Sequence, residues 1–76
     1  MKKYSNNPIP SIVDLGDGKY EFCWNFEQEQ VEDHISYWSN VVTIEGAPDK
    51  KAIINALTSE GIIEAEAIQL TNDLTL

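Results

Sequence analysis

Cys23 and His34 are the one cysteine and the one histidine of this chain, so they are its only candidates for a thiol nucleophile with a base. A base activates a thiol only from hydrogen-bond distance. The surrounding residues predict a hairpin that closes around residues 28–34, and this register places Cys23 several residue pairs away from His34. We therefore expect a half-buried structural thiol, a solvated imidazole and no catalytic residues, so the chain is not expected to be an enzyme.

Acidic residues gather in the stretch EQEQVEDH, which begins at residue 27. They are Glu27, Glu29, Glu32 and Asp33. A calcium loop needs ligands at fixed offsets and a Gly for its sharp turn, and this stretch has neither. A zinc site needs several Cys or His ligands, and the chain has only two such residues. We expect a solvated acidic loop with no metal and no cofactor, and we take these four residues together with Trp38 as candidates for binding a partner.

The charge balance narrows the choice of partner. Five Lys and no Arg stand against 13 acidic residues, which leaves a net charge of −8. Such a chain repels phosphate backbones and anionic lipid headgroups, so we expect no direct binding to nucleic acid or membrane. No run of residues approaches the length of a membrane span, and the start lacks the pattern of a signal peptide, so we expect a cytoplasmic protein.

An aromatic residue occupies every second position of YEFCWNFE, residues 20–27. This period predicts a half-buried strand from Lys19 to about Gln28, with Tyr20, Phe22, Trp24 and Phe26 all facing the core. A shorter strand at residues 11–15 precedes it across a turn at residues 16–18, which is rich in Gly. Pro8 and Pro10 oppose regular structure before that, so residues 1–10 are expected to form a flexible arm and residues 11–76 a single domain.

The run ISYWSNVVTIE, residues 35–45, predicts a third strand with apolar residues on both faces. One face would hold Trp38, Val42 and Ile44, and the other Ile35, Tyr37 and Val41. A strand of this kind either lies in the middle of its sheet or presents an apolar outer face to a partner.

Helix signals begin after this strand. We expect Pro48 at the first helical position, Asp49 in the first turn and Gly61 in the left-handed conformation at the end. The apolar stripe would be Ile53, Ile54, Ala56 and Leu57, with Lys50, Lys51, Asn55 and Thr58 facing water. A shorter second helix would carry Ile63, Ala67, Leu70 and Leu74. The predicted fold is α+β: a three-stranded antiparallel β-meander with one or two α-helices packed on one face.

The segment from Tyr37 to Leu57, above all VTIEGAPDKKAIINAL, resembles a set of small, mostly uncharacterised proteins encoded by phages and prophages of gut bacteria. The residues that carry the resemblance are Glu45, Gly46, Pro48, Ile53, Ile54, Ala56 and Leu57. It implies an aromatic strand pair, an E-G-x-P turn and an amphipathic helix. It implies no catalytic residues.

Three functions are compatible with these features. We favour a non-enzymatic interaction or structural module of phage or prophage origin that associates with a protein partner or with itself through exposed strand edges. The first alternative is an acidic decoy that inhibits a basic nucleic-acid-binding protein of the host. The second is a small-ligand binder that uses Trp24 and Trp38 as a stacking pair, which requires both rings to be exposed.

Overall fold

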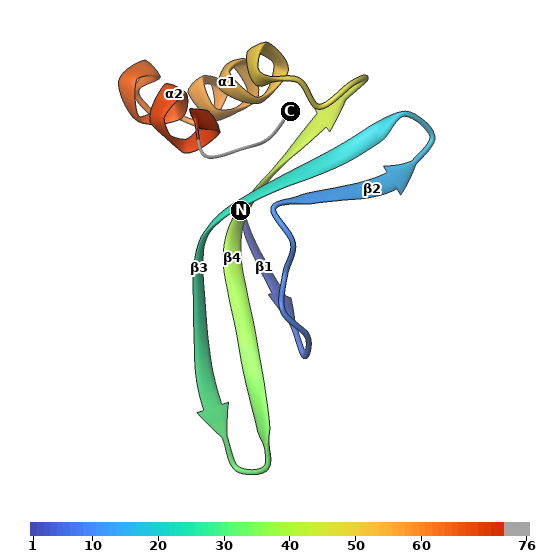
Figure 1. Cartoon of the computed structure of the whole chain (residues 1–76), viewed down its shortest axis with the longest axis vertical. Coiled ribbons are helices and arrows are strands. Elements are labelled where there is room, and N and C mark those ends of the chain that lie inside the picture. Colours follow the sequence, from blue (N-terminus) through green and yellow to red (C-terminus); the bar gives the residue numbers. More distant parts are fainter. Residues whose placement is uncertain (73–76) are drawn as a thin grey trace.

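The computed structural model describes residues 1–72, which form an α+β fold (Figure 1). Its elements in chain order are β1 (Lys2–Ser5), β2 (Ile12–Gly16), β3 (Lys19–Val31), β4 (His34–Glu45), α1 (Lys50–Ser59) and α2 (Glu64–Asn72). The strands form one antiparallel sheet in the order β1-β4-β3-β2. The predicted class is confirmed, and the predicted strands form the meander β2-β3-β4. The predicted number of three strands was wrong, because a fourth strand joins the sheet.

The additional strand is β1, which lies within the segment expected to be an arm without regular structure. Its register runs antiparallel to β4, from Lys2 opposite Asn40 to Ser5 opposite Tyr37. The pairing reaches the chain start, where the backbone N–H of Val41 donates to the carbonyl of Met1 over 2.9 Å. These four residues have no apolar pattern of their own. They form a strand because the edge of β4 has free backbone N–H and C=O groups with which they pair. Pro8 and Pro10 lie in the connection that follows.

A β-bulge divides the long β3–β4 hairpin into two halves. Trp24 pairs with Asn40 and Glu27 with Trp38. Between these two pairs, β3 therefore has one residue more than β4. Asn25 takes the left-handed conformation there, with φ +59°, and Asn is among the few residues that adopt it readily. Beyond the bulge, residues 25–38 form what we call the distal hairpin, which extends away from the helices to the opposite end of the molecule (Figure 1).

The core lies between the helices and the half of the hairpin nearest to them. It contains Phe22, Trp24, Val42, Ile44, Ile53, Leu57 and Ala67. Phe22 stacks on Trp24 with 5.8 Å between ring centroids. The expected aromatic stripe is therefore core at Phe22 and Trp24 and half-buried at Tyr20, but Phe26 is 50% exposed. The prediction for Phe26 was wrong because the bulge ends the simple alternation one residue before it.

The ends of α1 explain its position over the sheet. Asp49 is the N-cap, and its Oδ1 accepts a 2.8 Å hydrogen bond from the backbone N–H of Ala52. Pro48 thus precedes the cap instead of opening the helix. Gly61, at φ +94°, completes the predicted left-handed end, where the N–H of Ile62 donates to the carbonyl of Leu57.

Side-chain burial along the two helices follows most of the predicted pattern. Ile53 and Leu57 are fully buried on α1, with Ile54 and Ala56 half-buried and the predicted polar face exposed. On α2, Ala67 is buried and Leu70 half-buried, whereas Ile63 precedes the helix and is 68% exposed. Leu74 lies outside the described residues. Both helices cover the same face of the sheet, as predicted (Figure 1).

Candidate functional site: the distal hairpin

The acidic stretch is mostly strand, so its prediction as a loop was wrong. β3 runs to Val31, which pairs with His34 across a turn of only two residues, Glu32 and Asp33. Glu32 adopts φ +55°, and the Gln30 side chain amide donates to its carbonyl over 3.1 Å. The segment shows no apolar alternation because both of its faces meet solvent. It is a strand because β4 supplies its backbone partners.

The structure places the five candidate residues in two groups. Glu27 pairs with Trp38, and Glu29 pairs with Ser36, so these three candidates lie on the face of the sheet that also carries the helices. Glu32 and Asp33 lie at the tip. The distal hairpin holds no Lys, and its one basic group, His34, has Nδ1 3.6 Å from Oδ1 of Asp33 with both side chains exposed. This end of the molecule is therefore uniformly acidic.

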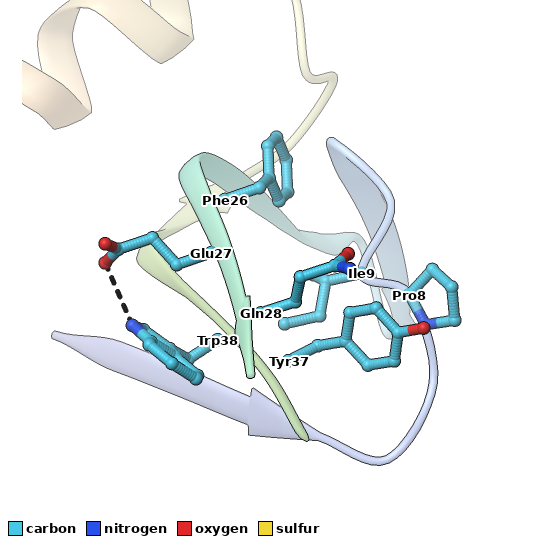
Figure 2. A pocket seen from close by; sticks show the side chains of 7 residues that line it. All are labelled: Pro8, Ile9, Phe26, Glu27, Gln28, Tyr37 and Trp38. Carbon is cyan, nitrogen blue, oxygen red and sulfur yellow. Dashed lines mark hydrogen bonds between the residues drawn. The ribbon is translucent and has the colours of Figure 1, made fainter. Parts of the chain in front are cut away.

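Trp38 links three strands on that face. Its Nε1 donates a 2.9 Å hydrogen bond to Oε2 of Glu27 on β3 (Figure 2). On its other side, Trp38 is the register partner of Tyr4 on β1, which is 68% exposed. The result is a row of two aromatic rings and one carboxylate across the sheet. Sequence reasoning missed Tyr4, since nothing local indicates that residues 2–5 lie beside β4.

An open hollow of about 280 Å³ lies at the root of the distal hairpin. Its lining residues are Pro8, Ile9, Phe26, Glu27, Gln28, Tyr37 and Trp38. Gln28 and Tyr37 point toward the β1–β2 connection at Pro8 and Ile9, and Phe26 stands above them (Figure 2). The exposure of Phe26 is thus part of a surface feature. The only sequence signal for it was Asn25, a residue typical of left-handed positions.

The outer edge of β3 is covered near the helices and free beyond them. β2 reaches only to the pair Ile12–Phe22, after which the N–H of Cys23 donates to the carbonyl of Ser11 over 2.8 Å. Within residues 1–72, no strand pairs with this edge along the distal hairpin.

The direction of the free backbone groups follows from the alternation of an antiparallel ladder. Val41 points its N–H at Met1, so alternate residues of β4 face β1 and those between them, including Trp38 and Ser36, face β3. The backbone N–H and C=O groups of their partners Glu27 and Glu29 therefore point toward β4 and form hydrogen bonds with it. Gln28 and Gln30 direct their backbone N–H and C=O groups outward, away from β4.

The opposite face of the sheet holds the lone thiol. Cys23 is 1% exposed, next to Ser39, whose buried Oγ has no well-aligned hydrogen-bond partner among the described residues. Burial raises the pKa of the Cys23 thiol, and the nearby Ser39 hydroxyl and Lys3 oppose this rise only in part. Cys23 pairs with Val41 and His34 with Val31, so the structure does not bring thiol and imidazole together.

The second Trp is unavailable for the stacking-pair alternative. Trp24 is 8% exposed and stacks on Phe22 within the core, while Trp38 lies beyond the bulge. The Trp24 ring belongs to the core cluster beneath the helices, so the structure does not present the two indoles as an exposed pair. This geometry leaves Trp38, which is half-buried, as the more accessible of the two indoles.

No family model, no curated protein and no solved structure matches this chain. Among residues 1–72, no helix is long and apolar enough to cross a membrane, and no group of three or more acidic, His or Cys side chains is placed to hold a metal ion. The candidate site therefore rests on its own geometry. It is a projecting hairpin with an acidic surface, the half-buried indole of Trp38 and a free strand edge.

Proposed function

We propose that this protein is a non-enzymatic interaction module that binds a protein partner through its distal hairpin. The projection of this hairpin beyond the helices, with its outer strand edge unpaired, is the observation that carries the proposal (Figure 1). Natural proteins usually cover or blunt such edges, since they pair readily with other chains. An origin in a phage or prophage follows from the resemblance of residues 37–57.

The surface of the hairpin indicates the kind of partner. Four carboxylates lie on 14 residues without a Lys, and opposite charges speed encounter and select among partners. Tyr4 and Trp38 add aromatic area beside them, and aromatic residues are enriched at binding surfaces. A protein with a basic docking surface fits these features best.

The hairpin can be shortened without touching the core. Replacing residues 28–37 by Asn-Gly joins Glu27 to Trp38, register partners whose backbone groups bond to each other, through a turn that suits a two-residue hairpin. None of the removed residues belongs to the core cluster. We expect the shortened protein to keep its helical circular dichroism and cooperative unfolding while losing the partner in affinity capture from host lysate.

The matched control keeps the hairpin and removes the same number of carboxylates elsewhere. It carries Glu60→Gln, Glu64→Gln and Glu66→Gln, all at exposed positions in or beside the helices, and these match the loss of Glu29, Glu32 and Asp33 from the shortened hairpin. Capture of the same partner by the wild type and this control, but not by the shortened protein, would support the proposal. Equal capture by the shortened protein would place the docking surface elsewhere.

The acidic decoy is the second candidate, favoured by the position of Glu32 and Asp33 at the tip and Glu27 and Glu29 on one face. A decoy must compete with nucleic acid for its target. We expect the captured protein to be released by added duplex DNA or RNA if this narrower function holds, and to stay bound if the hairpin uses another surface of the partner. Binding should weaken with salt, because exposed charges are screened over about 8 Å at physiological ionic strength.

A further inference from the structure

We infer that the partner binds as an added antiparallel strand on the outer edge of β3, with Lys or Arg at alternate positions opposite Glu27 and Glu29. This inference rests on the proposed function and specifies how the distal hairpin recognises its partner. It joins two separate observations, the direction of the free backbone groups and the position of the carboxylates along the same strand.

The free backbone groups on the outer edge of β3 provide the hydrogen bonds for an added strand. Gln28 and Gln30 direct their N–H and C=O groups away from β4, and within residues 1–72 no strand meets them. A strand placed alongside would satisfy both donors and both acceptors, which is the pattern of strand addition to a sheet edge. The register of β3 with β4 continues without a shift from Glu27 to Val31, between the bulge at Asn25 and the turn at Glu32.

The side chains select the charge of that strand. Glu27 and Glu29 are two residues apart and share one face, so they lie about 7 Å from each other along β3. An incoming strand has the same spacing, and its residues opposite these two share that face as well. Cationic side chains there gain the cross-strand pairing of opposite charges, and acidic ones are repelled.

Glu27 is already oriented for this pairing. Its Oε2 accepts from Trp38 Nε1 on the inner side of the strand, while Oε1 has no hydrogen bond to any described residue. On the other face, Gln28 and Gln30 present neutral amides, which tolerate Thr or Ser in a partner strand. The pattern recognised is therefore cationic on one face and small and polar on the other.

A second copy of this chain is a poorer occupant of the edge. Any antiparallel register that pairs Gln28 of one copy with Gln28 or Gln30 of the other sets Glu29 opposite a glutamate of the second copy. Like charges directly opposite are destabilising. The charges that attract a basic strand thus oppose pairing between identical chains, as charges on sheet edges commonly do.

The test uses a synthetic strand and the full chain. The probe is the capped peptide Thr–Val–Thr–Arg–Thr–Arg–Thr, whose Arg residues share one face when it is extended. The control peptide, Thr–Thr–Val–Arg–Arg–Thr–Thr, has the same composition with its Arg residues on opposite faces. Binding is followed by Trp38 emission and by the NMR shifts of the Gln28 and Gln30 amides. We expect the alternating peptide to bind about tenfold more tightly than the control and to shift both amides.

Substitutions at Gln30 separate the contribution of the backbone hydrogen bonds to peptide binding from that of the carboxylate charges. Gln30→Pro removes an outward N–H but no carboxylate, and edge strands tolerate Pro where the N–H faces solvent. Its matched control, Gln30→Thr, loses the same side chain and keeps the N–H. We expect Gln30→Pro to weaken the alternating peptide about tenfold and Gln30→Thr less than about threefold, with Glu27→Gln and Glu29→Gln together reducing both affinity and salt dependence.

Several outcomes would overturn the inference. They are equal binding of the two peptides, equal binding by Gln30→Pro and Gln30→Thr, no binding of the alternating peptide at millimolar concentration, or dimers of the free chain that Gln30→Pro dissolves. The proposed function fails differently, through partner capture that survives shortening of the hairpin. Loss of capture on shortening combined with no effect of Gln30→Pro would keep the module and reject strand addition.

Discussion

The indole Nε1 of Trp38 donates a 2.9 Å hydrogen bond to Oε2 of Glu27, its direct neighbour across β3 and β4. The pair lies just beyond the bulge, at the point where the hairpin leaves the helices. It holds together the first rung of the distal hairpin and fixes one of the carboxylates assigned to partner binding. The contribution of this hydrogen bond to stability can be separated from the effect of a negative charge at this surface. Glu29 serves as the comparison, because it lies on the same face and has no side-chain hydrogen bond to another described residue.

Glu27→Ala should lower the free energy of unfolding by about 0.5–1.5 kcal/mol, since it leaves the Trp38 N–H without its acceptor. Glu27→Gln keeps an acceptor oxygen and should cost less. The control, Glu29→Ala, should be nearly neutral. Urea unfolding monitored by circular dichroism measures all three, and an equal loss for Glu27→Ala and Glu29→Ala would show that the indole bond is not stabilising.

Asn25 gives a test of the bulge. A β-branched residue is strongly disfavoured at its φ of +59°, so Asn25→Val should destabilise the protein by about 1–2 kcal/mol, whereas Asn25→Gly should be tolerated. Thermal unfolding of the two variants compares them directly. A harmless Val at this position would contradict the left-handed conformation.

The Cys23 thiol should make stability depend on alkaline pH. Burial raises its pKa above the ordinary value of 9.0, so the folded protein keeps the proton at a pH where the unfolded chain begins to lose it. Stability is therefore complete below the unfolded pKa and falls as pH rises through the higher folded pKa. The wild type should lose more stability between neutral pH and about pH 10 than Cys23→Ala does, since the Ala variant lacks the group.

The same burial predicts a slow thiol. Alkylation of Cys23 by iodoacetamide at neutral pH should be at least about tenfold slower in the folded protein than in denaturant. Mass spectrometry at successive times follows the reaction. Rapid alkylation of the native chain would contradict the burial of the Cys23 side chain.

Asp49 should stabilise α1 through its cap. Asp49→Ala removes the acceptor for the Ala52 N–H and should cost about 1 kcal/mol, while Asp49→Ser retains a capping oxygen and should cost less. Chemical denaturation of both variants provides the comparison. Because Asp49 lies far from the distal hairpin, neither substitution should alter partner capture by the folded protein.

Local pattern was sufficient for the parts of the fold where one face is buried. The alternation of Tyr20, Phe22 and Trp24 predicted their strand and its core face, because side chains on a strand alternate strictly. The stripe on α1 and the glycine at its end were read in the same way. The bounds of these elements shifted by a residue or more, as with Pro48 and Asp49, since the position of a cap depends on which side chain reaches the first free N–H groups.

By itself the sequence determined an acidic α+β chain with a helix across an aromatic strand, because burial periods and caps are local properties. Only the tertiary structure decided that residues 2–5 form a strand, that Phe26 is exposed and that the acidic stretch is a projecting hairpin. Each of these depends on backbone pairing with β4, a partner distant in sequence, and such pairing leaves no apolar pattern where both faces meet water. The outward edge at Gln28 and Gln30, on which the proposed recognition depends, is a property of that pairing alone.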